Sequence, residues 1–321
     1  MAKDKPKQPQ WTKSQHYVPQ LYLRNFTNHT GMMFCYDKVS DKVKSVSTKA
    51  AAKETYFYEI PTVEMNAIEK FLGKIEDAWK PLISDLIKSA DSGSLTDGQI
   101  DEFSPFLVMQ WMRTKTFRDF VREAVNKNWQ SIGDTTLEVN NMPGKVKISM
   151  QEVTLPAVHA EQMFDASMLQ IMADSLLWHY WVVGKNDTDQ PFYTSDHPVV
   201  RRAHCQNDER KMLGARDPGI EYAFPLDSSH ILLILERTHF AEWKQYNNKC
   251  RPLTLEQVQD YNGLQVMRSC QRVYCAKDDF SVARQLCAAH PEIRDPNRPR
   301  VKVISTPIKD MKCQIITIPL E

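Results

Sequence analysis

Glycine is scarce in this chain of 321 residues, which has only 10 of them. A Gly-rich loop that cradles phosphate is therefore not expected, and neither GxxxxGK[ST] nor GxGxxG occurs. The HExxH motif and the motif set of protein kinases are also missing. These absences argue against P-loop NTPases, dinucleotide-binding enzymes, HExxH metalloproteases and kinases.

Neither sign of charge dominates, because Lys and Arg number 41 and Asp and Glu number 40, a formal net charge of +1. This balance argues against a protein that coats nucleic acid through its overall charge. No apolar run approaches the ~18 residues that a membrane-spanning helix needs. The first residues, MAKDKPKQPQ, contain no apolar signal region. We therefore expect a cytoplasmic protein with no membrane partner.

Paired cysteines are absent as well. The seven cysteines are scattered, and none belongs to a CxxC pair. An odd number of cysteines without a secretory signal indicates reduced thiols, and the spacing does not favour a structural zinc site.

Two long helices are the clearest elements of the sequence. Apolar residues recur with 3.6-residue spacing from Glu64 to Lys88 and again from Gln99 to Gln130. After Trp178 the pattern changes to short β-prone runs separated by turns. We predict an α+β fold in which the long helices of the first half pack on a mainly antiparallel sheet from the second half.

Polar residues interrupt or border the apolar faces of both helices. Glu69 and Glu76 are seven residues apart on one face, where carboxylates can bind a metal, accept an arginine, act as acid and base, or simply remain solvated. Gln110 and Arg113 share a face of the second helix. A buried Arg113 needs either a carboxylate from the other helix or an anionic group of a ligand, and the sequence leaves both open.

Two further segments carry candidate chemistry. His16 could serve as a general acid or base, or as a hydrogen-bonded structural residue. In the TSDHP run at 194–198, Pro198 favours an extended backbone before it, so Asp196 ends a strand. There Asp196 is either part of a site or the acceptor of an Asx-type turn.

The chain resembles the bacterial family of unknown function numbered 4238, in blocks that occur in the family's order. The blocks are QHYVPQLYLRNF (15–26), IEKFLGKIEDAWKPLI (68–83), FLVMQWMRT (106–114), FYTSDHPVV (192–200), FPLDSSHILLIL (224–235) and VQDYNGLQVMRSCQRVYCA (258–276). Because these blocks run through both halves, we expect one interlocked α+β domain over residues 14–289. We expect a disordered basic tail at 1–13 and, at 290–321, a Pro-rich linker followed by a C-terminal hairpin.

The resemblance marks particular residues but implies no activity. The marked residues are Gln15, His16, Tyr17, Pro19, Asn25, Phe26, Glu69, Glu76, Gln110, Arg113, Asp196, Pro198, Pro225, Leu226 and Asn262. His197 stands where the family resembles TSDNP, so a role for His197 stays open.

Our leading hypothesis from the sequence is an enzyme that acts on a phosphate-containing substrate, nuclease-like or nucleotide-modifying. His16, Arg113, Asp196 and Gln110 would be catalytic, with Arg113 stabilising phosphoryl charge. Substrate contacts would come from Gln15, Tyr17, Asn25 and Asn262. Asp196 with Glu69 or Glu76 would bind Mg²⁺ or activate water. The alternative is a non-catalytic binding or sensor module, for example in bacterial defence, whose polar residues form a structural network.

A nucleotide or nucleic-acid partner has modest support from two basic segments. Lysines recur in the first 13 residues, and a loop holds Arg201, Arg202, Arg210, Lys211 and Arg216. The same loop contains Asp208, Glu209 and Asp217, so a solvated loop is the competing interpretation. The oligomeric state cannot be predicted from these features.

Overall fold

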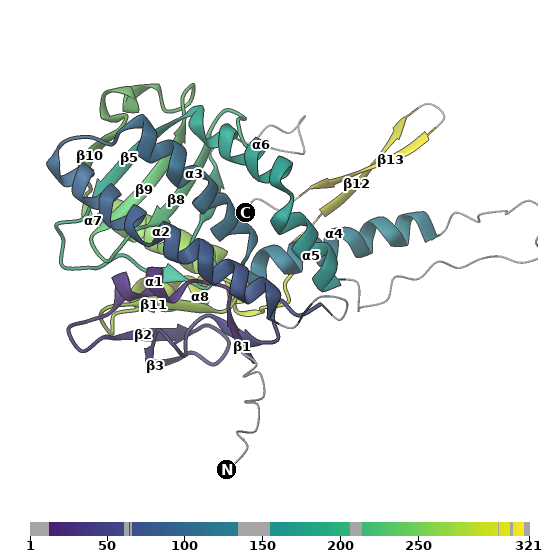
Figure 1. Cartoon of the computed structure of the whole chain (residues 1–321), viewed down its shortest axis with the longest axis horizontal. Helices are drawn as coiled ribbons and strands as arrows, with labels where there is room; N and C mark the ends of the chain where they lie inside the picture. The colour runs from purple at the N-terminus through teal and green to yellow at the C-terminus, as the bar shows by residue number, and fades with distance from the viewer. Residues whose placement is uncertain are drawn as a thin grey trace, which may run out of the picture.

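The computed structural model describes residues 13–60, 64, 66–133, 155–205, 214–300, 302–308 and 311–317. Residues 1–12 of the predicted basic tail and the centre of the basic loop, 206–213, lie outside this part. Helices and mainly antiparallel sheets make up the described chain, which confirms the α+β prediction (Figure 1).

The larger sheet has five strands in the order β10-β5-β9-β8-β7. They are β10 (Lys249–Pro252), β5 (His179–Lys185), β9 (His230–Glu236), β8 (Ile220–Pro225) and β7 (Val200–Ala203). Only the β10–β5 pair in this sheet is parallel. Every residue of β9 is buried, because both faces of this central strand are covered.

Helices cover the two faces of this sheet and create two layers of core. Leu232 and Ile234 of β9 belong to the core that includes the helices α2 (Ala67–Ser92), α3 (Asp97–Met112) and α6 (Ala166–Leu177) (Figure 1). The alternate residues Ile231, Leu233 and Leu235 pack with α7 (Leu255–Arg268) on the other face. This alternation follows from the two-residue period of a strand.

A second sheet has four strands, which come from the beginning and from the later part of the chain. Its order is β3 (Lys42–Ser47), β2 (Met32–Asp37), β11 (Arg272–Cys275) and β6 (Thr194–Ser195), with antiparallel pairing throughout. The hairpin of β2 and β3 therefore lies beside strands more than 150 residues later in the chain. Helix α8 (Ser281–Ala289) follows β11, and its Ala283 and Cys287 share a core with Tyr36 of β2.

The sequence predicted one long helix from Gln99 to Gln130. This prediction is wrong in one respect, because the segment forms two helices. Helix α3 ends at Met112, and α4 (Lys115–Gly133) begins after two intervening residues. Thr114 lies in the break and accepts a long hydrogen bond from the Phe117 backbone N–H at 3.4 Å, as an N-terminal cap would. The break separates Arg113, which faces α2, from Thr114, which contacts His197.

The remaining helices and strands are short. Strand β1 (Ser14–His16) pairs with β4 (Lys53–Thr55) and leads into α1 (Gln20–Leu23) and the 3₁₀ helix η1 (Arg24–Phe26). The others are α5 (Leu155–Phe164), the 3₁₀ helices η3 (Ala241–Tyr246) and η4 (Pro291–Arg294), and the paired strands β12 (Lys302–Ile308) and β13 (Met311–Thr317). Among the described residues, no helix is long and apolar enough to cross a membrane.

Candidate functional site

Arg113 is the centre of a polar cluster between α2, α3 and β1. Its side chain is 3 % exposed, and its Nη1 lies 2.8 Å from Oε1 of Glu76 on α2. Its Nη2 donates to the backbone carbonyl of His16 at 2.9 Å, and its Nε donates to the hydroxyl of Tyr58 at 3.4 Å. We call these residues, together with Glu69 and Gln110, the Arg113 cluster.

The ion pair between Arg113 and Glu76 decides between the two alternatives that the sequence left open for this arginine. The partner is a carboxylate from the other long helix. A buried guanidinium without such a partner would be destabilised by several kcal/mol. Burial opposes the charge of Arg113, but Tyr58 and Glu76 outweigh it and raise its pKa, so Arg113 is positively charged at any physiological pH.

Three other members of the cluster carry buried polar atoms that have no hydrogen-bond partner among the described residues. These atoms are both amide atoms of Gln110, Oε2 of Glu69 and Nε2 of His16. Gln110 is only 1 % exposed. Native proteins rarely leave buried polar groups unpaired, and an unpaired group destabilises the fold by about 1–3 kcal/mol. Such groups are therefore candidates for contact with a polar ligand.

The protonation of Glu69 and His16 suits acid–base chemistry near neutral pH. Burial raises the pKa of Glu69 to about 7; Arg113 lowers this pKa, and Glu76 and Glu59 raise it. Burial lowers the pKa of His16, although a hydrogen bond to the Lys49 backbone opposes the shift. Because Nε2 has no partner, Nδ1 makes that bond as a donor, and Nε2 carries the free lone pair of a neutral ring.

Gln15, predicted to contact substrate, instead ties the start of the chain to the cluster. It is fully buried, and its Nε2 donates to Oε1 of Glu59 at 2.6 Å. Its Oε1 accepts the Tyr58 backbone N–H at 2.7 Å. With both amide atoms used, Gln15 positions Tyr58 and Glu59.

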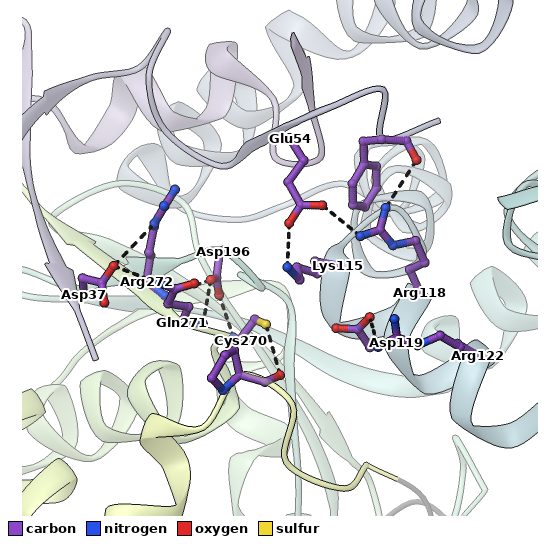
Figure 2. A network of polar contacts seen from close by, with 12 residues as sticks. Asp37, Glu54, Lys115, Arg118, Asp119, Arg122, Asp196, Cys270, Gln271 and Arg272 are labelled. Carbon is purple, nitrogen blue, oxygen red and sulfur yellow. Dashed lines mark hydrogen bonds and ion pairs between the residues drawn. The ribbon is translucent and has the colours of Figure 1, made fainter. Parts of the chain in front are cut away.

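Asp196 belongs to a different polar network, which Figure 2 shows. Its Oδ1 accepts the backbone N–H of Cys270 at 2.7 Å, and its Oδ2 accepts those of Gln271 and Arg272, both at 2.8 Å. The carboxylate is 1 % exposed and closes the turn between α7 and β11. No contact of Asp196 in the described residues points to catalysis: the geometry is that of a structural acceptor, and the catalytic role stays a prediction.

The expected metal site is not formed either. Among the described residues, no group of three or more His, Cys, Asp or Glu side chains could hold a metal ion. Glu76 is engaged by Arg113, and Asp196 by three backbone N–H groups. Glu69, Glu76 and Asp196 are thus not brought together as Mg²⁺ ligands.

The three remaining predicted substrate-binding residues also hold the fold together. Asn25 donates to the Leu226 carbonyl at 3.0 Å. Asn262 accepts the Tyr193 N–H at 2.7 Å and donates to the Pro191 carbonyl at 3.0 Å. Tyr17 is 4 % exposed and packs against Phe57, with ring centroids 5.0 Å apart. The contacts of these residues are internal to the fold, and their role in substrate binding stays a prediction.

Sequence reasoning missed several polar partners. Tyr58 and Glu59 lie in an aromatic run that was interpreted as strand or extended chain, and only the folded structure brings them beside Arg113. Glu54 of β4 pairs with Lys115 at 2.6 Å and with Arg118 at 2.9 Å, which joins β4 to α4 (Figure 2).

Arg202 was also misjudged as part of a solvated loop. It lies in β7 and pairs with the buried Glu221 at 2.9 Å and with Asp260 at 2.7 Å. Tyr261 and His204 contact the same Glu221 carboxylate. The guanidinium of Arg202 therefore belongs to an internal network of ion pairs and not to a nucleic-acid surface.

The fold and the Arg113 cluster define an α+β protein built around a buried, ion-paired arginine. The chain belongs to the family described as "Protein of unknown function (DUF4238)", whose model matches residues 14–279. The match confirms the resemblance found in the sequence. No curated protein and no solved structure matches the chain.

Proposed function

We propose that this protein is an enzyme acting on a phosphate-containing substrate and that the Arg113 cluster is its catalytic site. The observation that supports this proposal is the set of unpaired buried polar atoms on His16, Glu69 and Gln110. His16 and Glu69 interact electrostatically with the fixed positive charge of Arg113, and Gln110 lies three residues before it in the chain. Two of the three residues exchange protons. Such a set can bind and activate a polar, negatively charged substrate.

The proposed reaction is hydrolysis of a phosphate ester. Neutral His16 accepts a proton from water at Nε2 as the water oxygen forms a bond to phosphorus. The ester P–O bond breaks, and the leaving oxygen takes the proton that the Glu69 carboxyl holds. The charge of Arg113 stabilises the phosphoryl oxygens in the transition state, and Gln110 offers one donor and one acceptor to the substrate.

Turnover of RNA, DNA and nucleotides by the purified full chain, with and without Mg²⁺, tests this proposal. We expect His16→Asn and Glu69→Gln each to reduce turnover about 10²- to 10⁴-fold, because each removes a proton-transfer group. The matched control is Asp77→Asn, an exposed carboxyl on the same helix as Glu69, which should retain full activity. Absence of turnover with every phosphate substrate, or full activity in both site variants, would contradict the proposal.

The second candidate function is a non-catalytic binding or sensor module. It is favoured by the saturation of Arg113, whose guanidinium already contacts Glu76, His16 and Tyr58. In that case Arg113→Ala would lower the melting temperature, and the His16 and Glu69 variants would have no activity to lose. Loss of turnover at an unchanged melting temperature in His16→Asn distinguishes the enzyme from the module.

A further inference from the structure

A second polar site lies on the other side of the α3–α4 break. A cavity of about 160 Å³ is lined by four arginines, by His197 and by aromatic side chains that include Trp111. The arginines are Arg201, Arg268, Arg298 and Arg300. We call this cavity the arginine pocket; it shares no residue with the Arg113 cluster.

Segments that are far apart in the sequence form the arginine pocket. Trp111 comes from the end of α3, Arg201 from β7 and Arg268 from the last residue of α7. Arg298 and Arg300 follow η4, in the stretch that the sequence suggested was a linker. They also lie beyond residue 279, where the family match ends.

Arg298 is held in place by carbonyl groups only. Its Nη2 donates to the carbonyls of Met267 and Ser269 at 2.9 and 2.8 Å. Its Nη1 donates to three further carbonyls, those of Cys270, Ile293 and Asp295. Within the described part of the chain it has no ion pair. Burial, followed by the neighbouring charge of Arg300, lowers its pKa.

Arg300 adds a second charge, and its guanidinium has no carboxylate partner among the described residues. Its Nη2 makes one long contact, 3.4 Å, to the Pro296 carbonyl, and its Nε is buried without a hydrogen-bond partner in the described residues. Only its backbone N–H contacts an acid, Glu123, at 2.6 Å. Among the residues that line the pocket, Glu292 is the one carboxylate, and it pairs with His290 at 3.4 Å. The pocket is therefore electropositive.

His197 presents an acceptor beside these arginines. Its Nδ1 lies 2.7 Å from the hydroxyl of Thr114, and that hydroxyl donates its own hydrogen to the Trp111 carbonyl at 2.9 Å. Nδ1 is therefore the donor, and Nε2 carries the lone pair. Burial and the charges of the surrounding arginines lower the pKa of His197 to about 3, so the ring is neutral.

From this geometry we propose that the arginine pocket binds a small molecule that bears a phosphate group. Guanidinium groups recognise phosphate oxygens with charge-assisted hydrogen bonds. Nε2 of His197 can accept the hydrogen of a singly protonated phosphate. Trp111, Phe117 and Phe120 line the same cavity and can contact an apolar or aromatic portion of the ligand. The small volume fits a phosphate ester or pyrophosphate and not a folded macromolecule.

Calorimetric titration of the full chain with inorganic phosphate, pyrophosphate and AMP tests this inference. We expect at least one probe to bind, more weakly at higher salt. Arg300→Gln should weaken that binding tenfold or more, because the neutral side chain lacks the charge, while the backbone contact to Glu123 remains. Arg201→Gln, on another wall of the pocket, provides a second variant if Arg300→Gln does not fold.

The matched control is Arg122→Gln, on the α4 helix that also contributes Phe117 and Phe120. Arg122 is half exposed and pairs with Asp119 at 2.8 Å, outside the pocket (Figure 2). Its variant should bind as the unmodified protein does. The comparison of phosphate and pyrophosphate with AMP shows whether the ligand is inorganic or organic. A short RNA oligonucleotide is titrated in the same way. Lack of binding by every small probe, equal binding by Arg300→Gln and Arg122→Gln, or binding of the RNA oligonucleotide alone would overturn the inference.

Discussion

At the scale of single residues, buried polar groups in this protein serve two different purposes. Arg113 and Asp196 have partners for their charges: a carboxylate and a main-chain carbonyl for the first, three backbone N–H groups for the second. Gln110 and Glu69 have buried atoms without partners in the described residues. The saturated residues stabilise the fold, and in our proposal the unsaturated ones contact the substrate.

Glu69 should make the stability of the protein depend on pH. Its carboxyl titrates near 7 in the folded state and near its ordinary value of 4.5 in the unfolded chain. The native state therefore holds more protons between these values, and the free energy of unfolding falls as pH rises from 4.5 to 7. After allowance for partial exposure, this loss is about 2 kcal/mol.

Thermal unfolding of Glu69→Gln from pH 4.5 to 8 measures this effect. The variant cannot ionise at this position, so its melting temperature relative to the unmodified protein should rise across that range. The melting temperature of Asp77→Asn, at an exposed position of the same helix, should change with pH as that of the unmodified protein does. If the melting temperature of Glu69→Gln changes with pH as that of the unmodified protein does, the pKa of the Glu69 carboxyl is not raised.

At the scale of elements, close packing between β5, β9 and the segment after β10 fixes the larger sheet. Gly184 of β5 has no side chain, and a Cβ there would lie 2.5 Å from Cδ1 of Leu253 and 2.9 Å from Cγ2 of Ile231. Ile231 is fully buried in β9. The glycine thus lets a neighbouring segment approach the sheet more closely than any other residue would allow.

Gly184→Ala should therefore destabilise the protein by about 1–3 kcal/mol, the usual effect of overpacking a core. Gly73→Ala is the control, because its Cβ would meet nothing within 4 Å on the exposed side of α2. That change should stabilise the helix by about 0.5–1 kcal/mol. Urea unfolding of both variants measures the two shifts, and equal effects of the same sign would refute the packing argument.

At the scale of the whole molecule, the chain passes repeatedly between its two larger sheets. The first-half strands β2 and β3 are completed by β11 and β6 from the second half. The largest core cluster contains Tyr22 from α1, Phe106 from α3 and Phe224 from β8. Among the described residues, elements from the first and the second half of the chain therefore share one core.

We predict that residues 14–289 unfold as one cooperative unit. Urea denaturation followed by tryptophan fluorescence and by far-ultraviolet circular dichroism should give coincident transitions. The tryptophans report on the helices and the larger sheet, whereas circular dichroism reports on the whole backbone. Two separated transitions would indicate that the two sheets belong to independent domains.

The sequence by itself determined the class of fold, the family and every residue of the Arg113 cluster except Tyr58. Periodicity located the long helices, since an amphipathic stripe is a local property of the chain. It also placed Glu76 and Arg113 on helix faces where an ion pair could form. The predicted single helix over 99–130 failed because Thr114 caps α4 within an otherwise helical pattern and is held by His197, a tertiary contact that periodicity does not show.

Only the tertiary structure decided which polar residues meet. Tyr58 and His16 are far from Arg113 in the sequence and contact it only in the folded chain. Asp196 does not contact Arg113 in the described residues and instead accepts hydrogen bonds from the turn at 270–272. The arginine pocket is the extreme case, because Arg201, Arg268 and Arg300 are joined only by long-range folding. Residue types and the periodicity of apolar residues are local properties of the sequence, but the pairing of buried charges depends on which elements pack together.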